Sequence, residues 1–134
     1  MSDTKPRIAA HAIGRRREAI ASVRLYAGTG VIEVNERPID KYFPGLAAKA
    51  RYSQPFKLLG VEKYDATVRT HGGGPNGQLD ATVLGLSRCL ADIKDEYHKL
   101  LSVNGFMSRD SRIRERRKVG TGGKARRGKQ SPKR

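Results

Sequence analysis

The fold of this chain is decided by residues 64–90, which read YDATVRTHGGGPNGQLDATVLGLSRCL. Residues 64–70 alternate, so that Tyr64, Ala66, Val68 and Thr70 share one face, and a period of two predicts a β-strand. A glycine-rich loop follows, and apolar residues then recur at steps of three or four, which predicts a helix with one apolar face. We expect this helix to pack on a sheet that contains the strand.

The helical pattern continues beyond residue 90. Its apolar positions are Leu79, Val83, Leu86, Leu90, Ile93, Tyr97 and Leu100. One straight helix over 77–103 would be about 40 Å long at 1.5 Å per residue, which is long for a body of this size. The pattern therefore predicts a break around 92–95, with Gly105 capping the final turn.

Residues upstream of this stretch predict further strands. Residues 7–13 form a weak strand candidate, whereas 20–26 alternate well and 31–34 are rich in β-branched side chains. The glycines within 27–30 permit the positive φ of a hairpin turn, so we expect an antiparallel hairpin over about 19–35. A second turn is expected at 35–37.

Short helices are predicted between residues 38 and 60. Pro38 suits the first helical position, and apolar residues follow at helical spacing before Pro44. Residues 46–52 form a second stretch, and Pro55 opens a third that Gly60 closes. The order of strands, short helices, strand and main helix predicts an α+β fold over 11–108, a two-layer sandwich of sheet and helices.

The end of the chain is strongly basic. The net charge of the 134 residues is +15, and residues 109–134 hold 12 Lys or Arg and two acids, a net of +10. With three scattered aliphatic residues, Ile113, Val119 and Ala125, this segment cannot offset an ordering cost of about 1–2 kcal/mol per residue. We expect a flexible N-terminus over 1–10, a globular body over 11–108, and an extended basic tail that is disordered without a negatively charged partner.

The composition also limits the cellular compartment in which we expect the protein. Cys89 is the single cysteine, so no disulfide framework is possible, and the N-terminus has no apolar run typical of a signal peptide. No run of 18 apolar residues occurs, and the tail lacks the Leu, Phe or Trp of a membrane-surface helix. We expect a soluble cytoplasmic protein whose first candidate partner is nucleic acid, not a membrane.

The loop at 72–77 permits three interpretations. GGGPNG satisfies the G-x-G-x-x-G pattern, but the strand that should bring a ribose-binding acid is missing, so dinucleotide binding is disfavoured. A tight strand-to-helix turn needs glycine for positive φ and close packing. Free N–H groups at the helix start could also meet a phosphate of a bound polynucleotide.

Catalytic and metal-binding patterns are absent from the sequence. His11, His71 and His98 are far apart, and no pair of residues has metal-ligand spacing. We expect no cofactor, no metal and no enzyme activity. Arg15, Arg16 and Arg17 form a different kind of candidate, because three adjacent guanidinium groups repel one another unless phosphates lie near them.

These motifs together resemble the family of bacterial small-subunit ribosomal protein nine. The similar segments are GRRREA at 14–19 with Ala21 and Val23, GTG at 28–30, VN at 34–35, YF at 42–43, GGG at 72–74, GQ at 77–78, GF at 105–106, RD-x-R at 109–112, ERRKVG at 115–120, KARR at 124–127 and the final Lys133-Arg134. The resemblance covers about residue 12 to the end. The stretch at 128–132 departs from the family, since its aromatic residue is missing and its proline is moved.

The resemblance implies a structural protein of the small ribosomal subunit that binds 16S ribosomal RNA in the subunit head. It implies a left-handed β-α-β unit, like the second domain of small-subunit ribosomal protein five, and neighbours among the head proteins. It implies no small-molecule substrate. The tail would thread between RNA helices, with Lys133 and Arg134 reaching the anticodon stem-loop of P-site tRNA.

The resemblance and the charge pattern give one set of expected ribosomal RNA contacts. They are Arg15, Arg16, Arg17, Gly72, Gly73, Gly74, Arg109, Arg112, Arg114, Arg116, Arg117, Lys118, Lys124, Arg126, Arg127 and Lys129. Two alternatives stay open. One is a non-specific protein that compacts nucleic acid through its basic tail, and the other is a phosphate-binding enzyme that uses the glycine loop.

Overall fold

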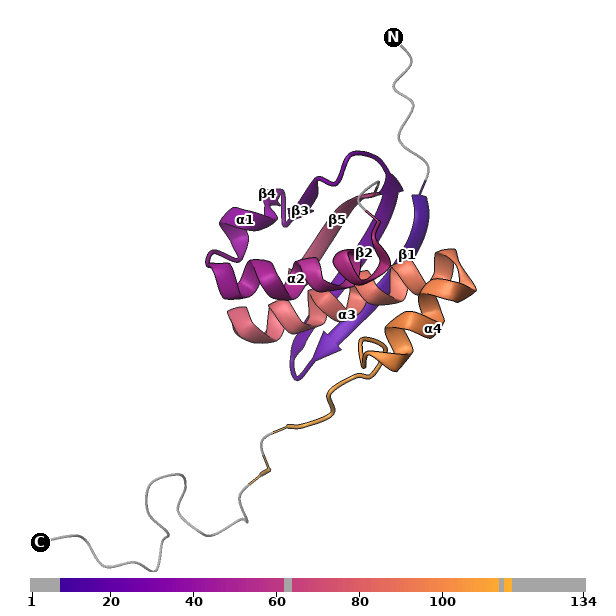
Figure 1. Cartoon of the computed structure of the whole chain (residues 1–134). Coiled ribbons are helices and arrows are strands. Elements are labelled where there is room, and N and C mark those ends of the chain that lie inside the picture. Colours follow the sequence, from indigo (N-terminus) through magenta and orange to yellow (C-terminus); the bar gives the residue numbers. More distant parts are fainter. Residues whose placement is uncertain (1–7, 62–63, 114, 117–134) are drawn as a thin grey trace, which may run out of the picture.

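The computed structural model describes residues 8–61, 64–113 and 115–116 of the chain. Its elements, in chain order, are β1 (Ile8–Arg16), β2 (Ala19–Ala27), β3 (Ile32–Val34), β4 (Arg37–Pro38), α1 (Ile39–Tyr42), α2 (Leu46–Leu59), β5 (Tyr64–His71), α3 (Pro75–Ile93) and α4 (Asp95–Val103) (Figure 1). The predicted α+β class is confirmed. Because β1 begins at Ile8, residues 8–10 belong to the sheet and not to the flexible N-terminus that we expected over 1–10.

The sheet has five strands in the order β1-β2-β5-β3-β4. The β1–β2, β2–β5 and β3–β4 pairs are antiparallel, whereas β3 runs parallel to β5. The helices pack on one face of this sheet, with α2 and α3 lying across it (Figure 1). The predicted alternation of β5 is confirmed, since Ala66, Val68 and Thr70 are buried while the residues between them are exposed.

The predicted hairpin over 19–35 is wrong, because β5 lies between β2 and β3. The cause is the carboxylate of Asp65, whose Oδ1 accepts backbone N–H bonds from Thr29, Gly30 and Val31 at 3.0, 2.9 and 2.9 Å. These bonds hold the glycine-containing loop over the start of β5, so the chain crosses to the far side of that strand. They also lower the pKa of Asp65, the Val31 N–H contributing most. The hairpin that contains β2 is instead formed with β1, the strand that precedes it in the chain, and β5 pairs with the other edge of β2.

The expected series of short helices over 46–59 is replaced by one helix, α2, with Pro55 inside it. A proline inside a helix lacks a backbone donor and costs about 3 kcal/mol, so packing must compensate. Tyr52 and Pro55 are the buried residues of α2, which shows where that packing occurs. Gly60 ends the helix as predicted, in the left-handed region at φ 65°.

The predicted break in the long helix is confirmed at Lys94, which has an extended backbone at φ −143° and ψ 142°. The break changes the rotation of the second segment about its axis. Leu101 is therefore the buried residue of α4, whereas Leu100, which continues the periodic pattern, is 46% exposed. Gly105 follows the last turn at φ 82°, as expected of a helix cap.

The backbone of α3 lies unusually close to β1 and β2. A Cβ atom added to Gly14 would lie 1.9 Å from the carbonyl oxygen of Ala81 and 2.6 Å from the amide nitrogen of Gly85. A Cβ atom added to Gly85 would lie 2.6 Å from Cγ2 of Val23. Two glycines that face each other therefore set the distance between the main helix and the sheet.

We expect Gly14→Ala to destabilise the fold, because the added methyl group meets helix backbone that cannot rotate away. Overpacking of this kind costs about 1–3 kcal/mol or more in the free energy of unfolding, measured by urea denaturation. Gly74→Ala is the matched control, since no atom lies within 4 Å of its added Cβ. Equal losses of stability in the two variants would contradict the close-packing argument.

Candidate nucleic-acid interface

The turn that joins β1 to β2 lies directly beside the glycine loop. Arg17 and Glu18 form this turn, and Arg17 has a positive φ of 54°. Gly72 and Gly73 also have positive φ values, 77° and 64°. A Cβ atom added to Gly72 would lie 2.5 Å from the carbonyl oxygen of Glu18, so only glycine permits this approach. The structure thus brings together two motifs that lie more than 50 residues apart in the sequence.

The glycine loop leads into an open helix N-terminus. Gly74 is the N-cap of α3, Pro75 follows it, and no side chain caps the helix. The first described bond to this end is from the Gln78 N–H to the Gly74 oxygen, at 2.9 Å. The amide groups of Asn76 and Gly77 precede that bond and are therefore available to a ligand. The first turn of α3 contains no acid that would neutralise the helix dipole.

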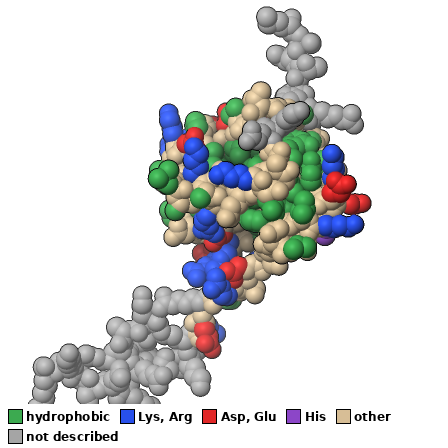
Figure 2. Space-filling view, viewed as in Figure 1, with side chains coloured by type: hydrophobic (Ala, Val, Ile, Leu, Met, Phe, Trp, Pro, Cys, Tyr) green, Lys and Arg blue, Asp and Glu red, His purple; other side chains and the backbone are tan. Residues whose placement is uncertain are grey.

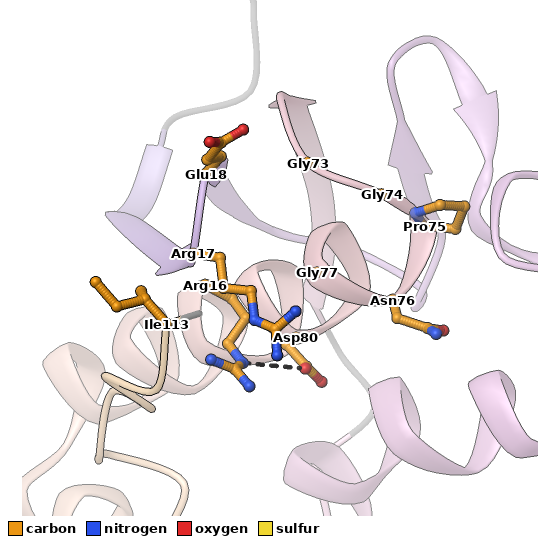
Figure 3. Close-up of a pocket in the computed structure, with 10 residues that line it drawn as sticks. All are labelled: Arg16, Arg17, Glu18, Gly73, Gly74, Pro75, Asn76, Gly77, Asp80 and Ile113. Atoms are coloured by element: carbon orange, nitrogen blue, oxygen red, sulfur yellow. Dashed lines mark ion pairs between the residues drawn. The ribbon is translucent and has the colours of Figure 1, made fainter. Parts of the chain in front are cut away.

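A hollow of about 790 Å³ joins the arginine turn to this helix N-terminus. Its lining residues are Arg16, Arg17, Glu18, Gly73, Gly74, Pro75, Asn76, Gly77, Asp80 and Ile113 (Figure 3). Exposed Arg17 supplies a charged guanidinium group, and the helix N-terminus supplies backbone N–H groups and a positive dipole end. This combination suits a phosphate group, which both features attract.

Arg16 lies inside the protein and has protein partners. It is 9% exposed, and its Nη1 donates to the carbonyl oxygen of Arg112 at 2.7 Å. Its guanidinium group also pairs with Asp80 at 3.6 Å and with Asp110 at 3.2 Å, the first of these drawn in Figure 3. Asp80 is shared with Arg51, which pairs with its other carboxylate oxygen. Arg16 therefore fixes the start of the tail to β1 and α3.

The start of the tail is itself folded on a carboxylate. Asp110 accepts from the backbone N–H of Arg112 at 3.0 Å, and from the guanidinium Nε and Nη2 of the same residue at 3.0 and 2.7 Å. These bonds, together with the charge of Arg16, hold the pKa of Asp110 well below its usual range. The ionised carboxylate directs the chain as it leaves the body. Figure 2 shows Lys and Arg side chains gathered at this exit.

A network of hydrogen-bonded polar side chains supports the glycine loop at Gly72. The Tyr42 hydroxyl donates to Oε1 of Gln78 at 2.6 Å, and the Gln78 amide donates to the Gly72 carbonyl at 3.1 Å. Asn35 donates to the Tyr42 hydroxyl at 3.1 Å and to the Thr70 carbonyl at 2.9 Å. None of these three side chains was expected from the sequence to support the loop. The sequence feature that could have identified them is their position, because Asn35, Tyr42 and Gln78 each fall in a segment that resembles the family.

The structure separates the expected contact residues into three groups. Arg15, Arg17, Arg109, Arg112 and Arg116 have exposed side chains, although Arg112 is engaged with Asp110. Arg16 is buried and bonded within the protein, so the structure gives its guanidinium group an internal role in place of the expected surface contact. The remaining basic positions lie outside the described residues: Arg114, Arg117, Lys118, Lys124, Arg126, Arg127, Lys129, Lys133 and Arg134.

The described residues contain no group of three His, Cys, Asp or Glu side chains that could hold a metal ion. No helix among them is long and apolar enough to cross a membrane. Cys89 is fully buried against the Val23 carbonyl, 3.5 Å from its sulfur, and burial raises the pKa of its thiol to about 12. This thiol packs as a small core side chain, and its burial favours the neutral form.

The sequence profile of the family described as ribosomal protein S9/S16 matches residues 14–134. The chain is 43% identical over 129 residues to the small ribosomal subunit protein uS9 of Pseudarthrobacter chlorophenolicus, covering 95% of this chain and 76% of that protein. It is 42% identical over 113 residues to the uS9 of Lawsonia intracellularis, covering 82% and 85%. It is 41% identical over 121 residues to the uS9 of Gloeothece citriformis, covering 89% and 88%.

We expect Tyr42→Phe to lower the free energy of unfolding by about 1–3 kcal/mol, because it leaves Asn35 and Gln78 without their shared hydroxyl partner. It should also speed amide hydrogen exchange in the glycine loop. Tyr97→Phe is the control, since no hydrogen bond to the Tyr97 hydroxyl occurs among the described residues. Unchanged loop exchange in Tyr42→Phe would show that the network does not hold the loop.

Proposed function

The chain belongs to the ribosomal protein S9/S16 family, whose members are non-enzymatic structural constituents of the small ribosomal subunit, and from this we propose that it binds 16S ribosomal RNA in the subunit head. One observation supports the site most strongly. The arginine turn and the uncapped N-terminus of α3 border one hollow, where they offer a cation and free backbone amides to the same phosphate.

The body contributes a defined part of this interface. Arg15 and Arg17 meet RNA phosphates, and Gly72, Gly73 and Gly74 allow the RNA backbone to approach the amides at the helix start. Arg16 acts from inside, because its bonds to the Arg112 and Asp110 carbonyl oxygens orient the tail relative to the hollow. Loss of Arg16 would therefore disturb RNA binding through the position of the tail.

The tail completes the interface. Residues 109–134 form a continuous basic segment beyond the globular body at 11–108, and its cations neutralise phosphates along their path. Lys133 and Arg134 at the end reach toward the anticodon stem-loop of P-site tRNA. The charge of the segment supports this role. Guanidinium groups suit it because they form bidentate hydrogen bonds with phosphate oxygens.

The proposal extends to the handedness of the fold and to the proteins that lie next to this one. β3 and β5 are parallel, and α1 and α2 lie between them in the chain, as in a β-α-β unit. We assign this unit the left-handed crossover of the second domain of small-subunit ribosomal protein five. Other head proteins of the small subunit contact the body, and the protein has no membrane partner and no small-molecule substrate.

We expect Arg17→Gln to weaken binding to a transcript of the 16S head domain and to reduce the salt dependence of that binding. Removing one phosphate contact lowers the slope of log affinity against log salt by about 0.7–0.9. Arg37→Gln is the matched control, because Arg37 is an exposed arginine on β4, at the opposite edge of the sheet. Filter binding across a salt series measures both variants.

Two results of this experiment would count against the proposal. If Arg37→Gln lowered the slope as much as Arg17→Gln, binding would depend on total charge and not on the site. If the wild-type chain bound an unrelated duplex of equal length as tightly as the head transcript at physiological salt, the protein would be a general nucleic-acid compacting protein.

We expect deletion of 131–134 to spare incorporation into small subunits and to weaken the retention of P-site tRNA, because the deleted end carries Lys133 and Arg134 and no part of the body. Sedimentation of subunits measures incorporation, and the rate of tRNA dissociation measures retention. Failure of the truncated protein to enter subunits would instead assign this end a structural role.

A further inference from the structure

The face of the sheet opposite the helices, called the open face below, is covered by no helix or strand among residues 8–61, 64–113 and 115–116. Along β1, β2 and β5 the buried residues alternate with residues that are exposed or half-buried, and the second set faces away from the helical layer. Pairing across the three strands arranges this set in rows: Arg15, Ile20 and His71; Ile13, Ser22 and Arg69; His11, Arg24 and Thr67. The strand register therefore determines which side chains are neighbours on this face.

Each of these rows contains one arginine. Arg15, Arg24 and Arg69 are all exposed, and none of them forms an ion pair with another described residue. Arg24 and Arg69 are diagonal neighbours on adjacent strands, about 7–8 Å apart by sheet geometry. Three unpaired guanidinium groups on one rigid surface repel one another unless an anion lies over them.

The acids of the open face lie toward one corner. Glu33 on β3 pairs in register with Thr67, which places it at the far end of the row of Arg24. Asp65 belongs to the next row, where its carboxylate accepts three N–H groups of the loop at 29–31. Neither acid lies in the rows of Arg15 and Arg69. The positive side of the face is thus the side nearer the β1–β2 turn.

That side is continuous with the arginine turn. Arg15 stands two residues before Arg17, and His71 in the same row immediately precedes the glycine loop. Successive rows are about 6.7 Å apart. Leading away from the hollow, Arg15 on β1, Arg69 on β5 and Arg24 on β2 occupy one row each, so the arginines alternate across the three strands. A charged polymer that occupies the hollow can follow these rows without leaving the surface.

We propose that the open face of the sheet is a second RNA-binding surface, on which Arg24 and Arg69 bind backbone phosphates of the RNA strand that enters the hollow. The inference rests on the proposed function. RNA fits this face better than a protein partner, because its backbone offers a phosphate to each exposed arginine, whereas a protein would need a separate acid opposite each of them.

The test compares two double variants of the full chain. Arg24→Gln with Arg69→Gln should lower the salt slope for the 16S head transcript by about 1.4–1.8, the sum of two phosphate contacts. Lys49→Gln with Lys57→Gln removes the same charge from exposed positions of α2, on the helical layer, and should leave the slope near the wild-type value. Arg24→Lys with Arg69→Lys should retain most of the slope. Urea denaturation verifies that all variants fold.

The possible results separate the two proposals. If the wild type binds the transcript while the open-face and α2 variants have the same slope, the open face is not an RNA surface and the proposed function stands. If the open face is protected from hydrogen exchange in assembled subunits without any loss of slope in the variant, a protein covers it and the inference is overturned. If the wild type fails to bind the transcript, the proposed function itself is wrong.

Discussion

The close contact between α3 and β1 is the constraint on which the rest of the structure depends. Gly14 and Gly85 face each other, and the Ala81 carbonyl lies where a side chain at Gly14 would begin. This contact sets how near the main helix lies to the sheet, and hence where the N-terminus of the helix meets the arginine turn. The buried side chains of α3 and the strands then fill the remaining space. A single packing distance therefore determines both the core and the geometry of the candidate interface.

Two sets of polar side chains connect this packed core to the glycine loop and to the tail. Under the glycine loop, Tyr42 and Gln78 connect α1 and α3 to the Gly72 carbonyl. At the tail, buried Arg16 bonds to the Arg112 carbonyl and pairs with Asp80 and Asp110. Buried groups of this kind are costly unless every partner is present, so they favour one arrangement of loop and tail. A buried arginine can thus shape the candidate interface through the position of the tail.

Much of the fold followed from periodicity. The alternation of 64–70 and the three-and-four spacing of 79–93 identified β5 and α3, and the length of the helical pattern indicated the break at Lys94. The strand order could not be predicted in this way. The glycines at 28 and 30 were interpreted as a hairpin turn, whereas Asp65, distant in sequence, binds that loop and carries the chain across β5. Pro55 was expected to begin a separate helix, but it lies inside α2, where its burial compensates for the missing backbone donor.

The site was partly predictable. The motif at 14–19 and the glycine loop were both identified as phosphate-binding candidates, but only the fold shows that they border the same hollow. The sequence could not separate Arg16 from Arg15 and Arg17, because three adjacent arginines look alike until the pleat of β1 turns one of them inward. The same pleat places Arg15 on the open face. Residues 117–134 lie outside the described structure, so their expected contacts stay predictions.

The central claim is that the fold presents one continuous RNA-binding surface, from the tail exit through the arginine turn and the glycine loop. Cross-linking of protein to RNA in small subunits assembled with this chain, followed by mapping of the linked peptides, tests it most directly. The account predicts cross-links in peptides that contain Arg17, residues 72–77 and residues 109–116, and few or none in α2. Cross-links concentrated on α2, with none at the turn or the loop, would contradict it.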